Sequence, residues 1–298
     1  MIVVTPEKKK RNAGAHWYST GGLPVHTQPD GKNTTLRHAR KQNLLPSVTT
    51  LIGQLEKPQL SKWKADKCIA ESFNNPPREG EALRDYQNRI HQSLKDEQTD
   101  ILDFGTRIHK AIEDVNNGTF DSLKEPDLFP FVEPFIRWSH HRLKTVKAVE
   151  KIVVNPRYGY GGTVDLHCVL YKENRPITIV DYKTQNIRNG KVNFYESWVY
   201  QLAAYRKCFK PVPQCVSLVI NSNEPSDPIE KIWTAKELQA GWRIFKRLCR
   251  IWQDAKGYKP LALDEDGVGI ARLYDEGCTQ WKFSTNLFQT PCSSASRV

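Results

Sequence analysis

The sequence Gly162-Thr163-Val164-Asp165 is followed by a polar break and then by Ile177-Thr178-Ile179-Val180-Asp181-Tyr182-Lys183. These two stretches decide the fold. The second is an apolar, β-type run that ends in an acid, a spacer and a lysine. Because a strand alternates its faces with period two, Asp181 and Lys183 are predicted to point to one side and Tyr182 to the other. Asp165 ends a similar β-rich run, and a hairpin would bring it beside Asp181 and Lys183.

Two carboxylates beside one amine predict a compact site for a divalent cation. Mg²⁺ prefers hard oxygen ligands and keeps several waters, and the carbonyl of Tyr182 is a further candidate ligand. Gly161 and Gly162 permit a bulge or a close approach of the backbone to a ligand. The alternatives without function are a salt bridge at a strand end for Asp181 and Lys183, and an ordinary hairpin turn before Asp165.

Two predicted helices carry the other candidates for the site. Gly105 and His109 lie one turn apart on the first, and Gln201 and Tyr205 lie one turn apart on the second, so each pair shares a face. An imidazole ligand would suit Mn²⁺ better than Mg²⁺. The alternatives are an ordinary core or surface histidine, and a helix rim that hydrogen-bonds to the sheet.

Hydrophobic periodicity predicts helices and strands in an order typical of a mixed α/β sandwich. A small hairpin is expected over 16–26, and Ser47 is expected to cap a short helix. The expected helices cover residues 59–73, 81–98, 100–117, 130–147, 195–209 and 235–256. The expected strands cover residues 150–155, 161–171, 176–183 and 215–221.

Composition and charge favour a soluble globular protein with a polyanionic partner. The chain is 39% hydrophobic and 26% charged, with a formal net charge of +11 and a pI near 9.2. No apolar run approaches the length of a membrane span, and no secretory signal follows Met1. The seven cysteines show no zinc-type pairing, and we expect reduced thiols in the cytoplasm of a bacterial or phage-infected cell, or in an organelle.

Four motifs in this order resemble the RecB-type branch of the PD-(D/E)xK nuclease family. They are Gly105 to His109, Gly162 to Asp165, Asp181 to Lys183, and Gln201 to Tyr205, and together they cover roughly residues 100 to 220. Residues 46–49 and the Trp63-Lys64 pair are similar to the lead-in of mitochondrial genome maintenance exonucleases and related phage-type exonucleases. One departure is Val164, which stands where the pattern has proline before the first acid.

The resemblance implies a restriction-endonuclease-like α/β core, in which helices flank a central mixed sheet, with a mostly helical N-terminal extension. The expected boundaries are 1–99 for an extension that covers the DNA channel, 100–257 for the nuclease core and 258–298 for a tail. It implies a metal-dependent exonuclease of replication, recombination or repair that acts on single-stranded DNA or DNA ends. His109, Asp165, Asp181 and Tyr182 would hold Mg²⁺ or Mn²⁺. The catalytic residues would be Asp165, Asp181, Lys183, Gln201 and Tyr205.

Further candidates lie around these motifs. Glu150 opens a predicted strand and could add a carboxylate, or could simply pair with a lysine there. Nucleic-acid contacts are expected from five residues: Lys151, Arg157, Tyr160, Thr184 and Trp198. Several RecB-type relatives hold an iron–sulfur cluster on one upstream and three clustered downstream cysteines. Because Cys278 and Cys292 are isolated, we expect no cluster here.

Two other functions compete with this hypothesis. One is a DNA-binding subunit with a degenerate nuclease fold, in a recombination, repair or defence complex. The other is a phosphoester hydrolase with a small substrate, which the charge of +11 argues against.

Overall fold

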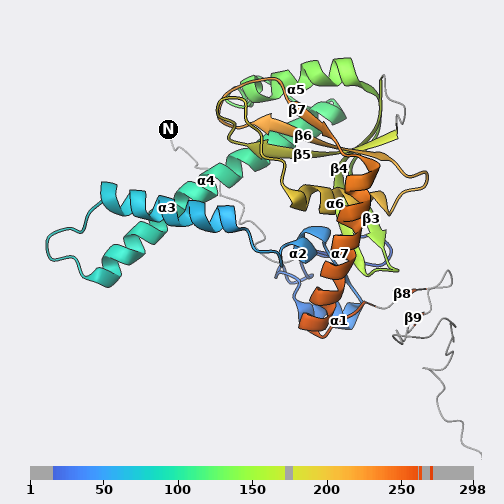
Figure 1. The fold of residues 1–298 in the computed structure, drawn as a ribbon, viewed down its shortest axis with the longest axis horizontal. Coiled ribbons are helices and arrows are strands. Elements are labelled where there is room, and N and C mark those ends of the chain that lie inside the picture. Colours follow the sequence, from blue (N-terminus) through green and yellow to red (C-terminus); the bar gives the residue numbers. More distant parts are fainter. Residues whose placement is uncertain (1–15, 172–176, 261, 264–268, 271–298) are drawn as a thin grey trace, which may run out of the picture.

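A five-stranded mixed sheet forms the centre of the protein (Figure 1). The computed structural model describes residues 16–171, 177–260, 262–263 and 269–270. The strand order is β3-β4-β5-β6-β7; β5 and β6 are parallel and the other neighbours are antiparallel. These strands are β3 (Leu143–Asn155), β4 (Tyr160–Leu170), β5 (Ile177–Gln185), β6 (Gln214–Asn221) and β7 (Ile229–Ile232). The prediction of a mixed α/β fold is confirmed.

Helices cover both faces of this sheet, as Figure 1 shows for α5 on one side and α6 and α7 on the other. One buried cluster joins the sheet to α4 and α5, and a second joins it to α1, α2, α6 and α7. The crossover between the parallel strands β5 and β6 contains α6. The helices are α1 (Leu36–Gln42), α2 (Val48–Ile52), α3 (Pro58–Asn74), α4 (Leu83–Asn117), α5 (Phe129–Arg142), α6 (Glu196–Arg206) and α7 (Ala235–Lys256).

Local signals explain several helix ends. Ser47 accepts a hydrogen bond from the backbone N–H of Thr50 and caps α2, as predicted. Thr234 and Glu237 form a capping box at the start of α7, and Gly257 ends that helix in the left-handed conformation at φ 53°. The predicted span of α7 is confirmed.

The predicted helix over 130–147 is too long, because α5 ends at Arg142 and β3 begins at Leu143. Thr145 and Val146 pair with Val169 and Cys168 of β4. β-branched residues favour a strand, and the ladder hydrogen bonds with β4 outcompete another helical turn.

The hairpin of β3 and β4 changes its buried face halfway along. Tyr160 and Val164 of β4 belong to the α6–α7 cluster, whereas Leu166, two residues after Val164, belongs to the α4–α5 cluster. The switch falls at Asp165, and the flanking pairs of the ladder place Glu150 opposite it. Glu150 has a left-handed backbone, with φ 49°, which only a few per cent of non-glycine residues adopt. The regular alternation of side chains between the two faces of the sheet therefore breaks at this hairpin.

An arm made of α3 and the first half of α4 projects from the body (Figure 1). α3 has no buried residue, and α4 continues without a break from the arm into the body. The predicted pair of helices over 81–98 and 100–117 is thus one helix, and the expected boundary at residues 99 and 100 falls inside it.

Smaller elements complete the described part of the chain. β1 (Trp17–Tyr18) pairs with β2 (Leu45–Pro46), and a single bridge between Tyr18 and Pro24 forms the expected turn around the two glycines. β8 (Ala262–Leu263) pairs with β9 (Gly269–Ile270). Most of the expected tail over 258–298 lies outside the described residues. Among the described helices, none combines the length and apolar character that crossing a membrane requires.

Candidate active site

Three neighbouring strands each carry an acid at the same level of the sheet. Leu166 of β4 pairs with Val180 of β5, so the next residues, Asp165 and Asp181, lie opposite each other. Glu150 of β3 lies opposite Asp165 on its other side. The antiparallel ladders therefore bring together two acids that are 16 residues apart in the sequence, and place a third next to them.

Asp181 is 1% exposed and lies in a network with Lys183 and α6. The ammonium of Lys183 is 2.7 Å from Asp181 Oδ2 and donates a hydrogen bond of 3.3 Å to Gln201 Oε1. The amide of Gln201 donates to Asp181 Oδ1 at 2.9 Å and to the hydroxyl of Tyr205 at 3.2 Å. The two predicted motifs on β5 and α6 therefore form one hydrogen-bonded unit.

Asp165 is tied to the backbone of β5. Its Oδ2 accepts a hydrogen bond of 2.6 Å from the N–H of Tyr182. The Tyr182 ring points away from the acids, into the α4–α5 cluster, where it packs against Phe135 and its hydroxyl accepts a hydrogen bond from Asn116. Burial of this ring orients the strand and leaves the Asp181 and Lys183 side chains on the α6 side.

His109 approaches the site from α4. Its ring lies edge-on to that of Tyr182, with 6.2 Å between the ring centroids. A Cβ atom at Gly105, one turn earlier, would lie 2.7 Å from Thr184 Oγ1. A larger residue would have to displace the Thr184 hydroxyl at this spacing of α4 and β5, which gives the glycine of the Gly105–His109 motif a physical reason.

Gly162 has a similar role on β4. A Cβ atom there would lie 2.5 Å from Cε1 of Tyr205. The missing side chain makes room for the Tyr205 ring, which is 3% exposed and whose hydroxyl reaches Gln201. The glycine thus serves close packing of α6 on the hairpin.

Burial and mutual repulsion control the ionisation of the acids. Loss of hydration raises the pKa values of Asp165 and Asp181, although the nearby ammonium of Lys183 opposes the shift in both. The side chain of Glu150 is exposed overall, yet partial loss of hydration, followed by repulsion from Asp165 and Glu113, raises its pKa to about 7. Burial, and then the charge of Lys183, lowers the pKa of His109 to about 4, which leaves the imidazole neutral at pH 7.

The donor set fits a hard divalent cation. Asp181 Oδ2 is buried with no well-aligned hydrogen-bond donor among the described residues, and the ammonium of Lys183, 2.7 Å away, balances its charge. Within the described residues, no three His, Cys, Asp or Glu side chains are gathered closely enough to hold a metal. Mg²⁺ commonly uses one or two carboxylates together with waters and substrate phosphate, and Asp165 and Asp181 supply that pair.

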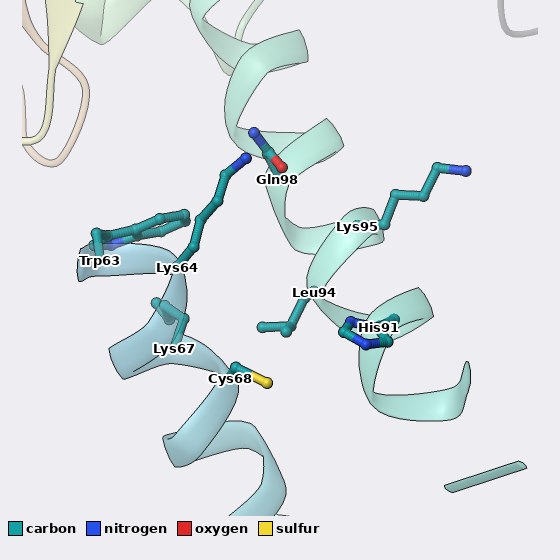
Figure 2. A pocket seen from close by; sticks show the side chains of 8 residues that line it. All are labelled: Trp63, Lys64, Lys67, Cys68, His91, Leu94, Lys95 and Gln98. Atoms are coloured by element: carbon teal, nitrogen blue, oxygen red, sulfur yellow. The ribbon is translucent and has the colours of Figure 1, made fainter. Parts of the chain in front are cut away.

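A groove of about 700 Å³ leads from His109 toward the arm. Gly105 and Thr184 line it near the site, and Trp63 and Lys67 line it at the arm. The last two residues also line a second hollow of about 290 Å³ between α3 and α4. Figure 2 shows this hollow, with Trp63, Lys64, Lys67 and Cys68 on α3 and His91, Leu94, Lys95 and Gln98 on α4. The two spaces therefore adjoin along α3.

Two predicted nucleic-acid contacts are wrong as surface contacts. Tyr160 is 0% exposed, and its hydroxyl donates to the carbonyl of Ala204. Trp198 is 8% exposed and packs edge-on against Phe194 and Tyr195. Both are core residues, because aromatic side chains are the largest apolar groups that a helix and a hairpin can bury against each other. Thr184 lies in the groove, whereas Lys151 and Arg157 are exposed and do not line it.

Sequence reasoning missed three neighbours of the site. Asn186 and Arg188 line the groove just beyond β5, and no local pattern points to them. Glu113 contributes to the raised pKa of Glu150. Its spacing of four residues from His109 on one helix is the signal that could have found it. Cys278 and Cys292, which bear on the expected absence of an iron–sulfur cluster, lie outside the described residues.

Comparison with known proteins gives little beyond this geometry. Neither a protein-family model nor a curated protein matches the chain. One similar solved structure is described as a "putative exonuclease" from Eubacterium rectale, with 13% sequence identity and a TM-score of 0.36. The match covers 52% of this chain and 68% of that one. A likeness at this level carries no argument about fold or function.

Proposed function

We propose that this protein is a metal-dependent nuclease of the RecB type that hydrolyses phosphodiester bonds in DNA. The observation that carries the proposal is the pair of opposed carboxylates, Asp165 and Asp181, with the Lys183 ammonium 2.7 Å from the second. Two carboxylates and an amine on adjacent strands supply ligands for a cation and a group for water.

In this mechanism the chain supplies ligands, a water-orienting group and positioning groups. Asp165 and Asp181 would hold Mg²⁺ or Mn²⁺ together with the Tyr182 carbonyl. The neutral imidazole of His109 and the carboxylate of Glu150 would have to move closer to add to this set. When bound, the cation lowers the pKa of the attacking water and stabilises charge that develops on the phosphate. Lys183 would orient or deprotonate that water. Gln201 and Tyr205 would position the substrate strand and hold Asp181 in place.

The groove and the arm favour an exonuclease over an endonuclease. The groove runs from His109 to Trp63 and Lys67, and the hollow beyond it adds Lys64 and Lys95. Lysines bind phosphate and an aromatic ring stacks on bases, which together suit a single strand or a frayed end. We therefore propose that the arm covers the strand that enters the site, in replication, recombination or repair.

A catalytically degenerate DNA-binding subunit is the second candidate. One observation favours it: both Asp181 oxygens already have partners in the chain, through Gln201 and Lys183. A cation must then displace Lys183 from Asp181 or share the oxygen with it. Strong DNA binding in EDTA, without cleavage in either metal, would support this reading.

Digestion of a labelled substrate panel tests the proposal. Single-stranded, duplex and circular DNA, labelled at the 5′ or the 3′ end, are incubated with Mg²⁺, with Mn²⁺ or with EDTA. We expect release of short products from linear DNA in either metal, no products in EDTA and none from closed circles. RNA of the same sequence serves as the specificity control. Cleavage that persists in EDTA would overturn the metal-dependent mechanism.

A further inference from the structure

α7 carries a run of cations on its outer side. Its inner side is buried through residues such as Leu238, Phe245 and Trp252. Between Leu238 and Gln253 the sequence has no acid and four basic residues: Arg243, Lys246, Arg247 and Arg250. Spacings of three and four residues place these like charges next to one another on the helix, where they repel.

Packing brings further cations to the same place. The ammonium groups of Lys207 and Lys246 lie 5.6 Å and 5.9 Å from the centre of the Trp242 ring. Tyr158 packs edge-on against Trp242 at 4.9 Å, and Arg157 lies 5.7 Å from the Tyr158 ring. These rings hold cations that come from the hairpin turn, the end of α6 and α7.

A third ring extends this surface to the edge strand β3. Phe209 follows Lys207 by two residues, and the ammonium of Lys151 lies 5.3 Å from its ring. Cation–π contacts keep the side-chain stems on apolar surface while the charged ends remain hydrated. We name the resulting cluster the α7 basic surface: Lys151, Arg157, Lys207, Arg243, Lys246 and Arg247.

None of the six cations of this surface forms an ion pair with an acid among the described residues. Some cations elsewhere are paired, whereas others, such as Lys64 and Lys95 of the arm, have no ion pair among the described residues either, so what distinguishes the α7 basic surface is the gathering of six cations. Arg107 pairs with Glu125 and Asp127, and Arg137 pairs with Glu133 and Asp227. Uncompensated like charges on a packed scaffold are an arrangement that a polyanion stabilises.

We propose that the α7 basic surface binds the phosphate backbone of a nucleic acid outside the cleft, through charge and without reading sequence. α2 lies between α7 and the arm (Figure 1), and none of the six residues of this surface lines the groove that reaches Trp63. Only the choice of a nucleic acid as the polyanion rests on the proposed function. It assigns Lys151 and Arg157 to this surface instead of the groove.

The test is the salt dependence of DNA binding by the full chain in EDTA, where cleavage does not interfere. Fluorescence anisotropy compares wild type with the triple variant Lys207→Gln/Arg243→Gln/Lys246→Gln on a long single strand and on a duplex. Loss of three phosphate contacts should reduce the slope of log K against log salt by about 2 to 3, and weaken binding about tenfold or more at low salt.

A matched triple variant controls for net charge. Lys32→Gln/Lys124→Gln/Arg137→Gln removes the same number of charges at residues that pair with acids. We expect it to keep the wild-type slope. Equal slopes in all three proteins, or equal losses in both variants, would overturn the proposal. If the first triple does not unfold cooperatively, the exposed pair Arg243→Gln/Arg247→Gln replaces it, with an expected slope change of about 1.5 to 2.

Two further comparisons distinguish this proposal from binding of another polyanion and from the proposed nuclease function. Tighter binding of wild type to anionic phospholipid vesicles or to polyglutamate than to DNA would overturn the choice of nucleic acid. If the salt slope falls in the triple variant but wild type cuts no substrate, the proposed nuclease function is wrong and the binding surface stands. If wild type cuts DNA but the triple variant keeps the wild-type salt slope, the binding surface is wrong and the proposed nuclease function stands.

Discussion

The body and the arm are built on different principles. In the body, Ile108 and Phe135 are 0% exposed and pack between the sheet and its helices. In the arm, Ile69 and Phe73 are 70% and 85% exposed, and α3 has no fully buried residue. A packed core holds side chains to one geometry, whereas a helix pair with few buried contacts opens at low free energy. The body can therefore hold the acids of a reaction centre, and the arm can adapt to a long ligand.

Polar contacts hold the two helices of the arm together. The hydroxyl of Tyr86 donates to the carbonyl of Ser72, Ser93 donates to Glu71, and Lys67 pairs with Glu97. Exposed ion pairs of this kind contribute about 0–1 kcal/mol each. The arm thus depends on helix propensity and on α4, which enters the body.

The largest expected effect is on catalysis, and it comes from the body. Asp181→Asn keeps the size of the side chain but removes a charge from the centre of the site, so DNA cleavage should fall by about 10²–10³-fold or more. The melting temperature should move by about 4 °C or less, because no cavity forms. End-labelled DNA and calorimetry measure the two quantities.

Asp121→Asn is the control, because Asp121 pairs with Lys124 on the surface between α4 and α5. Activity of Asp181→Asn near the wild-type level would remove Asp181 from the mechanism. Lys183→Ala should lose activity as well, and cleavage by this variant at the wild-type rate would do the same for Lys183.

One substitution made in both regions compares their packing. Phe135→Ala should lower the free energy of unfolding by about 3–5 kcal/mol, because it opens a cavity in the α4–α5 cluster. Phe73→Ala, at the exposed end of α3, should change it by about 0.5 kcal/mol or less. Urea unfolding followed by circular dichroism measures both. Similar losses at the two positions would refute the contrast between body and arm.

A smaller effect is expected where α6 packs on the hairpin. Gly162→Ala places a Cβ atom 2.5 Å from the Tyr205 ring, and relief of that overlap should cost about 1–3 kcal/mol of stability. Because Tyr205 is displaced, its hydrogen bond with Gln201 should weaken and cleavage should fall. Gly21→Ala is the control, since the nearest atom lies at 3.9 Å. An unchanged unfolding midpoint in Gly162→Ala would contradict the close approach.

The smallest effect on stability is expected in the arm. Trp63→Ala should change the free energy of unfolding by about 0.5 kcal/mol or less, because the ring is 37% exposed on a helix with no fully buried residue. If the ring stacks on a base, affinity for single-stranded DNA should fall by about 1–3 kcal/mol. Leu60→Ala, on the same helix at 39% exposed, is the control. Equal affinities for the two variants would remove the arm from the substrate path.

Secondary structure was largely predictable where a local signal existed. The caps at Ser47 and at Thr234 and the span of α7 follow from side chains within one turn. The shift from α5 to β3 at Leu143 was not predictable, because the pairing partner lies about 25 residues further along the chain. Nor was the length of α4, because the row of Leu83, Tyr86, Ile90 and Leu94 in its first half is interrupted by the polar residues 95–100 before the apolar row of its second half begins.

The candidate site shows the same division. The alternation of a strand predicted that Lys183 shares a face with Asp181. Helical spacing predicted that Gln201 and Tyr205 share a face of their helix. Both periodicities hold within a single element. The change of face at Asp165 and Glu150, and the burial of Tyr160 and Trp198, come from packing between elements. No periodicity within β4 contains that information.

By itself, then, the sequence determined which residues can share a face of a helix or strand and which residues lie at the ends of strands, because backbone geometry repeats over two to four residues. Only the tertiary structure decided that Glu150, Asp165 and Asp181 form a row and that the cations of α6, α7 and the hairpin form one surface. Those neighbours are set by strand register and by the packing of distant aromatic rings, which depend on the whole core at once.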